Sequence, residues 1–358
     1  MMDGYTLKSV SDLPLPFRSV FCFRYFNSLQ SECFPVCFYS DVNIVVSAPT
    51  GSGKTVLFEL CILRLLSRFL ADNGNIVHGK GSLKTIYIAP SKALVQEKLR
   101  NWNQKFGSLG VECLELTGDN EFYSRKSIQE ADIILTTPEK FDAVTRYRIN
   151  DGGLSFFGDI ALLLIDEVHL LNDPRGAALE AIVSRIKMLA RKPELDSCPL
   201  SRIRFVAVSA TIPNIEDLAE WLNVPAQGVK RFGEEMRAVK LTTKVLGYAR
   251  AKNDFLFEKS LQKYIYDLLM QYSAGKSSLV FCSTRKGALE AAQKLAQKVM
   301  TLGYSNPFVK DNAQLERLRE VSLSFSDKHL QACIPFGVGF HNGGLSLKDR
   351  NLVESQFL

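Results

Sequence analysis

Two short stretches of this sequence carry residue types that together could bind and hydrolyse a nucleoside triphosphate. The first follows an apolar run and precedes an amphipathic one, and it consists of Ala48, Pro49, Thr50, Gly51, Ser52, Gly53, Lys54 and Thr55. The two glycines allow backbone N–H groups to turn toward phosphate oxygens, and the N-terminus of the following helix adds a favourable dipole. Lys54 would bind the β and γ phosphates of ATP, and Thr55 would offer its hydroxyl to Mg²⁺. A chance glycine turn is the alternative, and the flanking strand and helix patterns disfavour it.

The second stretch is LLLIDEVH, residues 162–169, in which two carboxylates follow a buried apolar run. Asp166 would hold Mg²⁺, and Glu167 would orient and polarise the attacking water. The same pair could instead cap the next helix, but the phosphate loop upstream favours a catalytic role. His169 follows directly and could relay between the phosphate pocket and a neighbouring loop, although a lone histidine after a strand is usually structural. Candidates for that loop are Ser209, Ala210 and Thr211.

Short apolar runs that alternate with amphipathic segments predict the scaffold that positions these residues. Runs rich in β-branched residues and apolar on both faces are typical of parallel strands, and they cover residues 43–49, 85–90, 131–138, 161–167 and 204–211. Helical patterns lie between them, as at 56–70 and 91–106. The alternation predicts an α/β fold with a doubly wound parallel sheet, whose ligands bind at the carboxyl ends of the strands.

The pattern changes after Trp221 and predicts a second, incomplete α/β domain. Residues 277–284 read as a strand, 286–300 as a helix and 337–345 as a strand with a loop. We therefore divide the chain into an N-terminal segment, a first motor domain, a connecting segment and a partial second motor domain, at residues 1–40, 41–230, 231–276 and 277–358. Two or three strands are too few for an independently stable parallel sheet.

Composition favours an ordinary folded, intracellular and soluble protein without a membrane segment. The 358 residues carry a net charge of +6, which is compatible with a polyanionic partner. No apolar run approaches the roughly 20 residues of a membrane helix. The eight cysteines are scattered, and no second pair at zinc-finger spacing follows Cys33 and Cys37, so we expect reduced thiols.

The order of these motifs resembles that of the superfamily two helicases, and the likeness covers nearly the whole chain. It implies that the first sheet is a RecA-like one of the P-loop NTPase type and that the second domain is an incomplete RecA-like domain. FRYFNSLQSECF at residues 23–34 resembles the adenine-reading element, with Gln30 as its glutamine. APSKALVQEK, TGD and TTPEK resemble the strand-binding motifs of the first motor domain, and SLVFCSTRK and GVGFHNGGLSLKDR resemble motifs of the second. The nucleic-acid contacts implied are Pro90, Ser91, Lys92, Thr117, Gly118, Asp119, Thr136, Thr137, Pro138, Ser283, Thr284, Arg285, His341 and Arg350.

Within the Ski-like group of these DEVH-box helicases, the motifs most resemble those of the DNA helicases of meiotic crossover formation. The resemblance implies a monomeric, nuclear, ATP- and Mg²⁺-dependent 3′–5′ DNA helicase of homologous recombination, acting on single strands or branched junctions. Small, polar or cationic residues near strand ends, such as Ser91, Lys92 and Thr137, suit phosphate contacts, so binding should be non-specific and salt-sensitive. Lys92 could equally be a solvated helix residue, and residues 136–138 an ordinary turn.

The segment that carries the arginine finger in this family is not found in the sequence. No stretch resembles Q-x-x-G-R-A-G-R, and loss of such a finger costs about 10³ to 10⁵ in rate. We therefore expect a fragment or short product that separates strands poorly. Two alternatives remain: a non-catalytic module that binds ATP or nucleic acid, and an RNA helicase of the same group. A transporter ATPase is disfavoured, since no LSGGQ signature is present.

Overall fold

The computed structural model describes residues 6–77, 79–118, 125–148, 154–237 and 239–357. The chain forms two compact units, Met1–Leu241 and Thr242–Leu358. The division falls within residues 231–276, which the sequence indicates as a connecting segment. Part of that segment is helical: it contains α9 (Asp254–Leu261) and α10 (Ile265–Tyr272). Both helices belong to the second unit.

The first unit is built on a seven-stranded sheet in which every pairing is parallel. Its order is β3-β4-β2-β5-β6-β1-β7. The strands are β1 (Ile44–Ser47), β2 (Lys84–Ile88), β3 (Cys113–Leu116), β4 (Ile133–Thr136), β5 (Ile160–Ile165), β6 (Arg204–Ser209) and β7 (Val229–Arg231). The α/β prediction is confirmed, and all five expected strands form. Each ends earlier than expected, and β2 and β5 begin one residue earlier than expected, at Lys84 and Ile160. The two edge strands, β3 and β7, were not predicted, because they are short and only partly buried.

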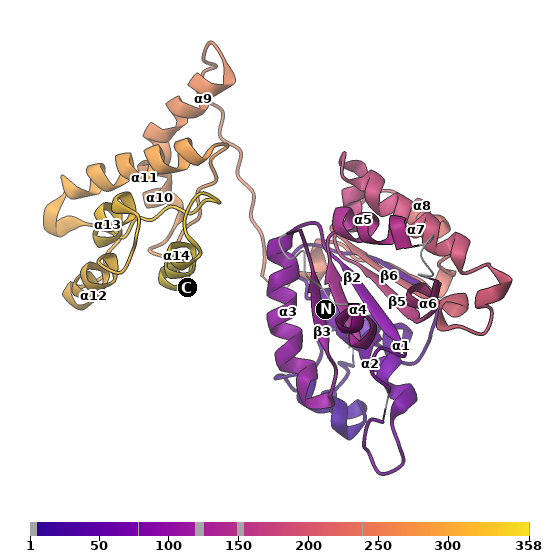
Figure 1. The fold of residues 1–358 in the computed structure, drawn as a ribbon. Helices are drawn as coiled ribbons and strands as arrows, with labels where there is room; N and C mark the ends of the chain where they lie inside the picture. The colour runs from indigo at the N-terminus through magenta and orange to yellow at the C-terminus, as the bar shows by residue number, and fades with distance from the viewer. Residues whose placement is uncertain (1–5, 78, 119–124, 149–153, 238, 358) are drawn as a thin grey trace. The chain divides into compact units, whose positions relative to one another are not determined.

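Helices cover both faces of this sheet, as Figure 1 shows. Successive residues of a strand point to opposite faces, so Ile44 and Val46 join one apolar core while Val45 joins the other. The first core is covered by α1 (Ser28–Phe38), α2 (Thr55–Leu66) and α3 (Lys92–Phe106). The second is covered by α4 (Arg125–Glu130), α5 (Pro138–Arg148), α6 (Leu154–Gly158), α7 (Gly176–Leu189) and α8 (Ile215–Trp221).

A buried ion pair joins α2, the helix that follows the phosphate loop, to α3. The Glu59 side chain is fully buried and accepts hydrogen bonds from Lys105 Nζ at 2.7 and 2.8 Å. Trp102 Nε1 donates to the same carboxylate at 3.2 Å. Burial raises the pKa of the Glu59 carboxyl, although Lys105 acts in the opposite direction. The pair therefore connects the two helices, and removing the charged carboxylate from water lowers its net contribution to stability.

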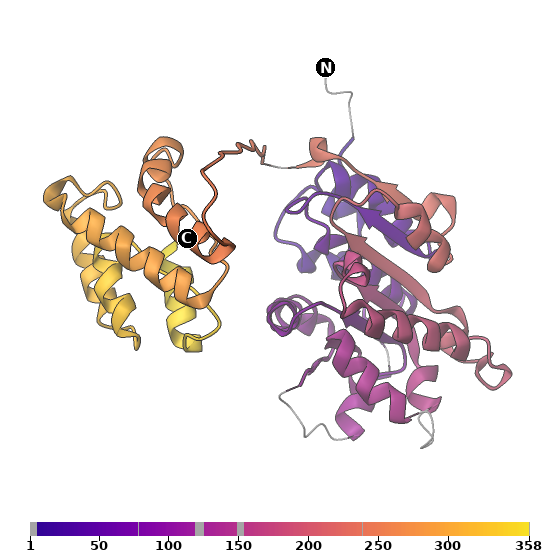
Figure 2. The same cartoon turned by 90° about the horizontal axis from the view of Figure 1, so that it is seen from above.

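The second unit is helical in the part of it that the structure describes, as Figure 2 shows in orange and yellow. Besides α9 and α10 it contains α11 (Arg285–Met300), α12 (Asn312–Ser322), α13 (Lys328–Cys333) and α14 (Leu347–Phe357). Its small apolar core includes Ala292, Leu318, Leu330 and Ile334. The expected helix at 286–300 is confirmed as α11.

The two strands expected in the second unit are not formed. Residues 277–284 have no regular secondary structure, and Leu279 and Phe281 are 68% and 92% exposed. Residues 337–345 form loops and turns, beginning at Gly337 with φ +76°. A strand needs a hydrogen-bonded neighbour to satisfy its backbone, and no described segment of this unit pairs with either stretch. The prediction of strands here was therefore wrong for this conformation.

Three observations concern the expectations drawn from composition, on cysteines, metal sites and membrane segments. All eight cysteines are free thiols. Among the described residues, no cluster of three or more histidine, cysteine or carboxylate side chains could hold a metal ion. None of the described helices has both the length and the apolar character that crossing a bilayer requires.

The Glu59–Lys105 pair gives a prediction about the stability of the first unit, which can be followed in the full chain. Both tryptophans of the chain, Trp102 and Trp221, lie in that unit, so their fluorescence reports its unfolding. Lys105→Met should lower the free energy of unfolding by about 3 kcal/mol, because it leaves Glu59 buried without its cation. Glu59→Gln/Lys105→Met should be more stable than Lys105→Met in urea titrations. A double variant that is no more stable than the single one would contradict this account.

Candidate active site

Parallel pairing brings the expected site residues of the first unit to one edge of the sheet. Ser47, the last residue of β1, pairs with Ser209, the last residue of β6. Ile88 at the end of β2 pairs with Ile165 of β5 on one side and Thr136 of β4 on the other. The phosphate loop, the DEVH stretch and the loop at 210–211 therefore leave the sheet at its carboxyl edge, where open α/β sheets bind ligands.

The phosphate loop has the conformation that its two glycines predict. Gly51 and Gly53 have φ values of +81° and +84°, a region that favours glycine. Lys54 Nζ donates to the carbonyl oxygens of Ala48 at 2.8 Å and Pro49 at 2.9 Å. Burial lowers the pKa of Lys54, while the two carboxylates after β5 act to raise it. The loop thus surrounds its own lysine, whose ammonium is the group that a triphosphate would draw outward.

Two side chains at the start of α1 support the phosphate loop from outside. Asn27 Nδ2 donates to the Ser52 carbonyl at 3.0 Å, and Gln30 Nε2 donates to the Gly53 carbonyl at 3.1 Å. The other end of the Gln30 amide accepts from Asn27 N at 3.0 Å. A Cβ on Gly53 would lie 2.5 Å from Gln30 Nε2. Gln30, expected to read adenine, is therefore bonded to the loop backbone in this conformation.

The two carboxylates after β5 differ in their surroundings. Asp166 Oδ2 accepts a hydrogen bond from the Tyr87 hydroxyl at 2.6 Å, and Oδ1 accepts from Glu167 N at 3.0 Å. Glu167 has φ +51°, a strained value for a non-glycine residue. Burial and the adjacent Asp166 raise the pKa of Tyr87, so the phenol stays protonated and donates. Tyr87 was missed in the sequence because its stretch reads only as a buried strand.

His169 lies between the carboxylates and the end of β6. Its Nδ1 is 3.2 Å from Ser209 Oγ and 3.4 Å from Glu167 Oε2. Ser209 is fully buried, whereas His169 is exposed. One imidazole nitrogen therefore contacts both the glutamate expected to polarise water and the loop expected to respond to it.

The loop after Ser209 is fastened to the end of β1. Ser47 Oγ donates to the Ala210 carbonyl at 3.3 Å and accepts from Ile212 N at 3.1 Å. Thr211 between them is exposed. The loop is thus attached to the strand that feeds the phosphate loop, while the Thr211 side chain remains accessible to a ligand.

Thr55 and Asp166 have the ligand types that a magnesium ion takes from a P-loop protein. Magnesium is held by one or two carboxylates together with water and substrate phosphates, so a hydroxyl and a carboxylate on one sheet edge fit it. Lys98 Nζ, from α3, lies 3.2 Å from Thr55 Oγ1. Nothing in the sequence pattern distinguishes Lys98 from a surface helix residue, and it was not predicted.

The expected nucleic-acid contacts of the first unit differ in accessibility. Gly118 is exposed, and Ser91, Lys92 and Thr137 are half-buried, as is Pro90, whereas Pro138 is buried. Ser91 caps the N-terminus of α3, with its hydroxyl accepting from Leu94 N at 3.3 Å. Asp119 lies outside the described residues.

The threonines at two strand ends are held within the protein. Thr117 and Thr136 are buried. The Thr117 hydroxyl donates to Glu115 Oε1 at 2.6 Å, and the Thr136 hydroxyl donates to the Leu116 carbonyl at 2.7 Å. The phosphate contacts expected of these two hydroxyls are therefore replaced here by internal hydrogen bonds.

An arginine that was not predicted connects two of the expected strand-binding loops. Arg175, which precedes α7, donates through its guanidinium to the Pro90 carbonyl and to Glu139 Oε1, the latter at 2.9 Å. Pro90 follows β2, and Glu139 is in the first turn of α5. The guanidinium therefore fixes the spacing of these two loops.

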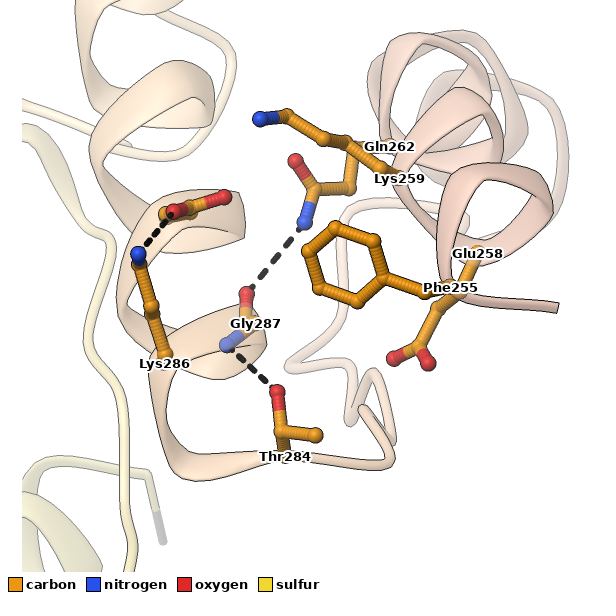
Figure 3. Close-up of a pocket in the computed structure, with 8 residues that line it drawn as sticks. Phe255, Glu258, Lys259, Gln262, Thr284, Lys286 and Gly287 are labelled. Carbon is orange, nitrogen blue, oxygen red and sulfur yellow. Dashed lines mark hydrogen bonds and ion pairs between the residues drawn. The ribbon is translucent and has the colours of Figure 1, made fainter. Parts of the chain in front are cut away.

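The expected residues of the second unit lie at the start of α11, in the loop before α14 and in the first turn of α14. Ser283, Thr284 and Arg285 are exposed. Thr284 caps α11 by accepting from Gly287 N at 2.9 Å, beside a small pocket that Glu258 also lines (Figure 3). Glu258 accepts from Ser283 N at 2.8 Å and from the Ser283 hydroxyl. A carboxylate thus occupies the amide and hydroxyl donors expected for a phosphate.

The other two expected residues of the second unit flank the start of α14. His341 is exposed, and its Nε2 lies 2.9 Å from Glu354 Oε1. Arg350 is half-buried, and its Nε is the one buried side-chain nitrogen or oxygen without a hydrogen bond among the described residues.

Comparison with known proteins agrees with this geometry. The protein-family model for the DEAD/DEAH box helicases matches residues 27–218. The chain is 74% identical to the ATP-dependent DNA helicase homolog MER3 of Arabidopsis thaliana and 72% identical to the MER3 homolog of Oryza sativa subsp. japonica. These matches cover 100% and 99% of this chain, but only 32% and 30% of the relatives. The chain therefore spans about a third of the length of the curated relatives it matches.

A solved structure supports the fold independently of sequence. The DUF1998 helicase MrfA in complex with DNA and AMPPNP superposes with a TM-score of 0.58, at 15% identity, over 94% of this chain and 50% of that one. The family match spans more than half of the chain and contains the phosphate loop, the DEVH stretch and the loop after β6. The chain belongs to the DEAD/DEAH box helicase family.

Proposed function

We propose that this chain is the ATP-hydrolysing part of a Mg²⁺-dependent helicase motor that moves on nucleic acid. The observation that carries the proposal is the convergence at one sheet edge of the phosphate loop, the Asp166–Glu167 pair and the His169–Ser209 contact. Many proteins have a phosphate loop. A hydrolytic pair connected through a histidine to a neighbouring loop is what a motor needs, because hydrolysis has to be communicated to a moving part.

Each residue of the site has a task that follows from its position. Lys54 leaves its two carbonyl partners to bind the β and γ phosphates, which Gly51 and Gly53 surround with backbone N–H groups. Thr55 and Asp166 would hold the magnesium ion, which when bound would neutralise charge on the phosphates. Glu167 would orient the attacking water and accept its proton.

The grip on nucleic acid is assigned to the loops beside this site. Ser91 and Lys92 at the start of α3 and Thr137 before α5 are at least partly accessible, and Arg175 sets the spacing of their loops. Such residues contact the phosphate backbone and carry no sequence preference. Binding should therefore weaken steeply as salt concentration rises.

The substrate proposed is DNA, and the setting is meiotic recombination in the nucleus. The naming of the similar plant proteins as ATP-dependent DNA helicases, at high identity to this chain, supports DNA as the substrate. The resemblance of the motifs to those of meiotic crossover helicases supports the setting. By the same family likeness we propose 3′–5′ movement along single strands or from branched junctions, by a monomer. RNA is the competing substrate, and the ratio of ATPase stimulation by single-stranded DNA and by RNA would decide between them.

Lys54→Ala should remove nucleic-acid-stimulated ATP hydrolysis. The loss should be about 100-fold or more, because the variant lacks the cation that stabilises the transferring phosphoryl group. Steady-state phosphate release with saturating single-stranded DNA measures it. Lys80→Ala is the matched control, since Lys80 is an exposed lysine paired with Glu112 and should leave the rate unchanged. Equal rates for Lys54→Ala and the wild type would exclude the proposed site.

The two glycines of the phosphate loop should respond differently to a methyl group. Gly51→Ala meets no atom within 4 Å, so it introduces only the strain of a positive φ, about 1 kcal/mol. Gly53→Ala should also displace Gln30 and Asn27 and break their bonds to the loop, at about 1 kcal/mol each. We expect lower stability in urea and weaker binding of a fluorescent ATP analogue for Gly53→Ala than for Gly51→Ala. The reverse order would show that the α1 contacts do not support the loop.

A further inference from the structure

The carboxylate of Asp166 is fixed at both of its oxygens. Oδ1 accepts from the backbone N–H of Glu167 at 3.0 Å, which comes from the same turn. Oδ2 accepts from the Tyr87 hydroxyl at 2.6 Å, which comes from β2, the neighbouring strand. Two donors on different oxygens define the plane of the carboxylate, and short hydrogen bonds to an ionised acceptor are strong.

Tyr87 is itself held in place by the core. Its side chain is fully buried, and its ring makes edge-to-face contacts with Phe58 of α2, at 5.7 Å between centroids, and with Trp102 of α3, at 5.0 Å. Its backbone pairs with Leu164 of β5, two residues before Asp166. The buried ring packs against these two aromatic side chains, so the hydroxyl is presented to Asp166 from a defined position.

A buried tyrosine needs an acceptor for its hydroxyl, and core packing alone would be satisfied by phenylalanine. Here the acceptor is the aspartate expected to bind the metal. Groups that hydrogen-bond to a metal-binding carboxylate orient it and commonly change metal affinity 10- to 100-fold when removed. A free carboxylate would have to lose its rotational freedom when the ion binds, whereas the carboxylate held by Tyr87 has already lost it.

We propose that Tyr87 is a positioning residue that holds the Asp166 carboxylate in the orientation needed to bind the magnesium ion of Mg²⁺–ATP. The proposal rests on the proposed nucleotide site. Tyr87 is fully buried, and its hydroxyl would act on the metal only through Asp166. Trp102 of α3 packs on the same ring. The first turn of α3 carries Lys92, an expected contact to the nucleic-acid strand. Tyr87 therefore connects α3 to the carboxylate expected to bind the metal.

The test is the Mg²⁺ dependence of nucleotide binding in the full 358-residue chain carrying Tyr87→Phe. A fluorescent non-hydrolysable ATP analogue is titrated at a series of Mg²⁺ concentrations and in EDTA. We expect the Mg²⁺ concentration for half-maximal binding to rise about 10-fold, with unchanged affinity in EDTA. The ring and its packing remain, so the fold should persist, which tryptophan fluorescence verifies.

A control and a double variant separate positioning from general loosening. Thr145→Val removes another buried hydroxyl, which donates to the Phe141 carbonyl away from Asp166, and should leave the Mg²⁺ dependence unchanged. In an Asp166→Asn background, Tyr87→Phe should cause no further change, because its effect passes through that carboxylate. This comparison remains informative if Tyr87→Phe proves less stable than the wild type.

Two results would overturn the proposal. One is a Tyr87→Phe protein whose Mg²⁺ half-point lies within twofold of the wild type. The other is a loss of affinity of the same size in EDTA and in Mg²⁺. A wild-type chain that binds the analogue without any Mg²⁺ dependence would overturn the proposed function as well, so the two failures are distinguishable.

Discussion

The parallel hydrogen-bonding register of β1, β5 and β6 is the constraint on which the rest of the site depends. It pairs Ser47 with Ser209 and sets Ile165 two strands from Ser47. The phosphate loop, the carboxylate pair and the loop at 210–211 leave the sheet side by side as a result. A slip of one residue in any of these strands would turn its apolar residues away from their core and move its catalytic residue to the other face. The two-sided core therefore specifies the geometry of the chemistry.

Buried polar and aromatic side chains hold the reactive groups in place at this sheet edge. Gln30 of α1 donates a hydrogen bond to the phosphate loop, Tyr87 of β2 donates one to Asp166, and Ser209 of β6 contacts His169. These side chains also reach α3 through the ring contact of Tyr87 with Trp102. The nucleotide-binding groups and the expected strand contacts are thus connected by contacts within the first unit. In the first unit, therefore, these contacts offer a route by which nucleotide binding can affect the binding of a nucleic-acid strand, and the reverse.

Sequence reasoning predicted the first unit well because its signals are local. Five strands rich in β-branched residues, the glycine loop and the DEVH turn each follow from a few neighbouring residues, and each is present. Tyr87, Lys98 and Arg175 were missed because their roles come from partners 79, 43 and 85 positions away, which one sequence cannot reveal. The strand expected around Phe281 was wrong for a related reason: an apolar, β-rich run becomes a strand only when a neighbour pairs with it.

We propose that one sheet edge binds both nucleotide and nucleic acid and couples the two binding events. The most direct measurement is the dissociation constant of the full chain for fluorescently labelled single-stranded DNA, at fixed salt concentration, with and without a saturating Mg²⁺-bound non-hydrolysable ATP analogue. The account predicts that the analogue changes the dissociation constant by at least about fivefold, the lower end of typical coupling between sites. Identical dissociation constants with and without the bound analogue would contradict it.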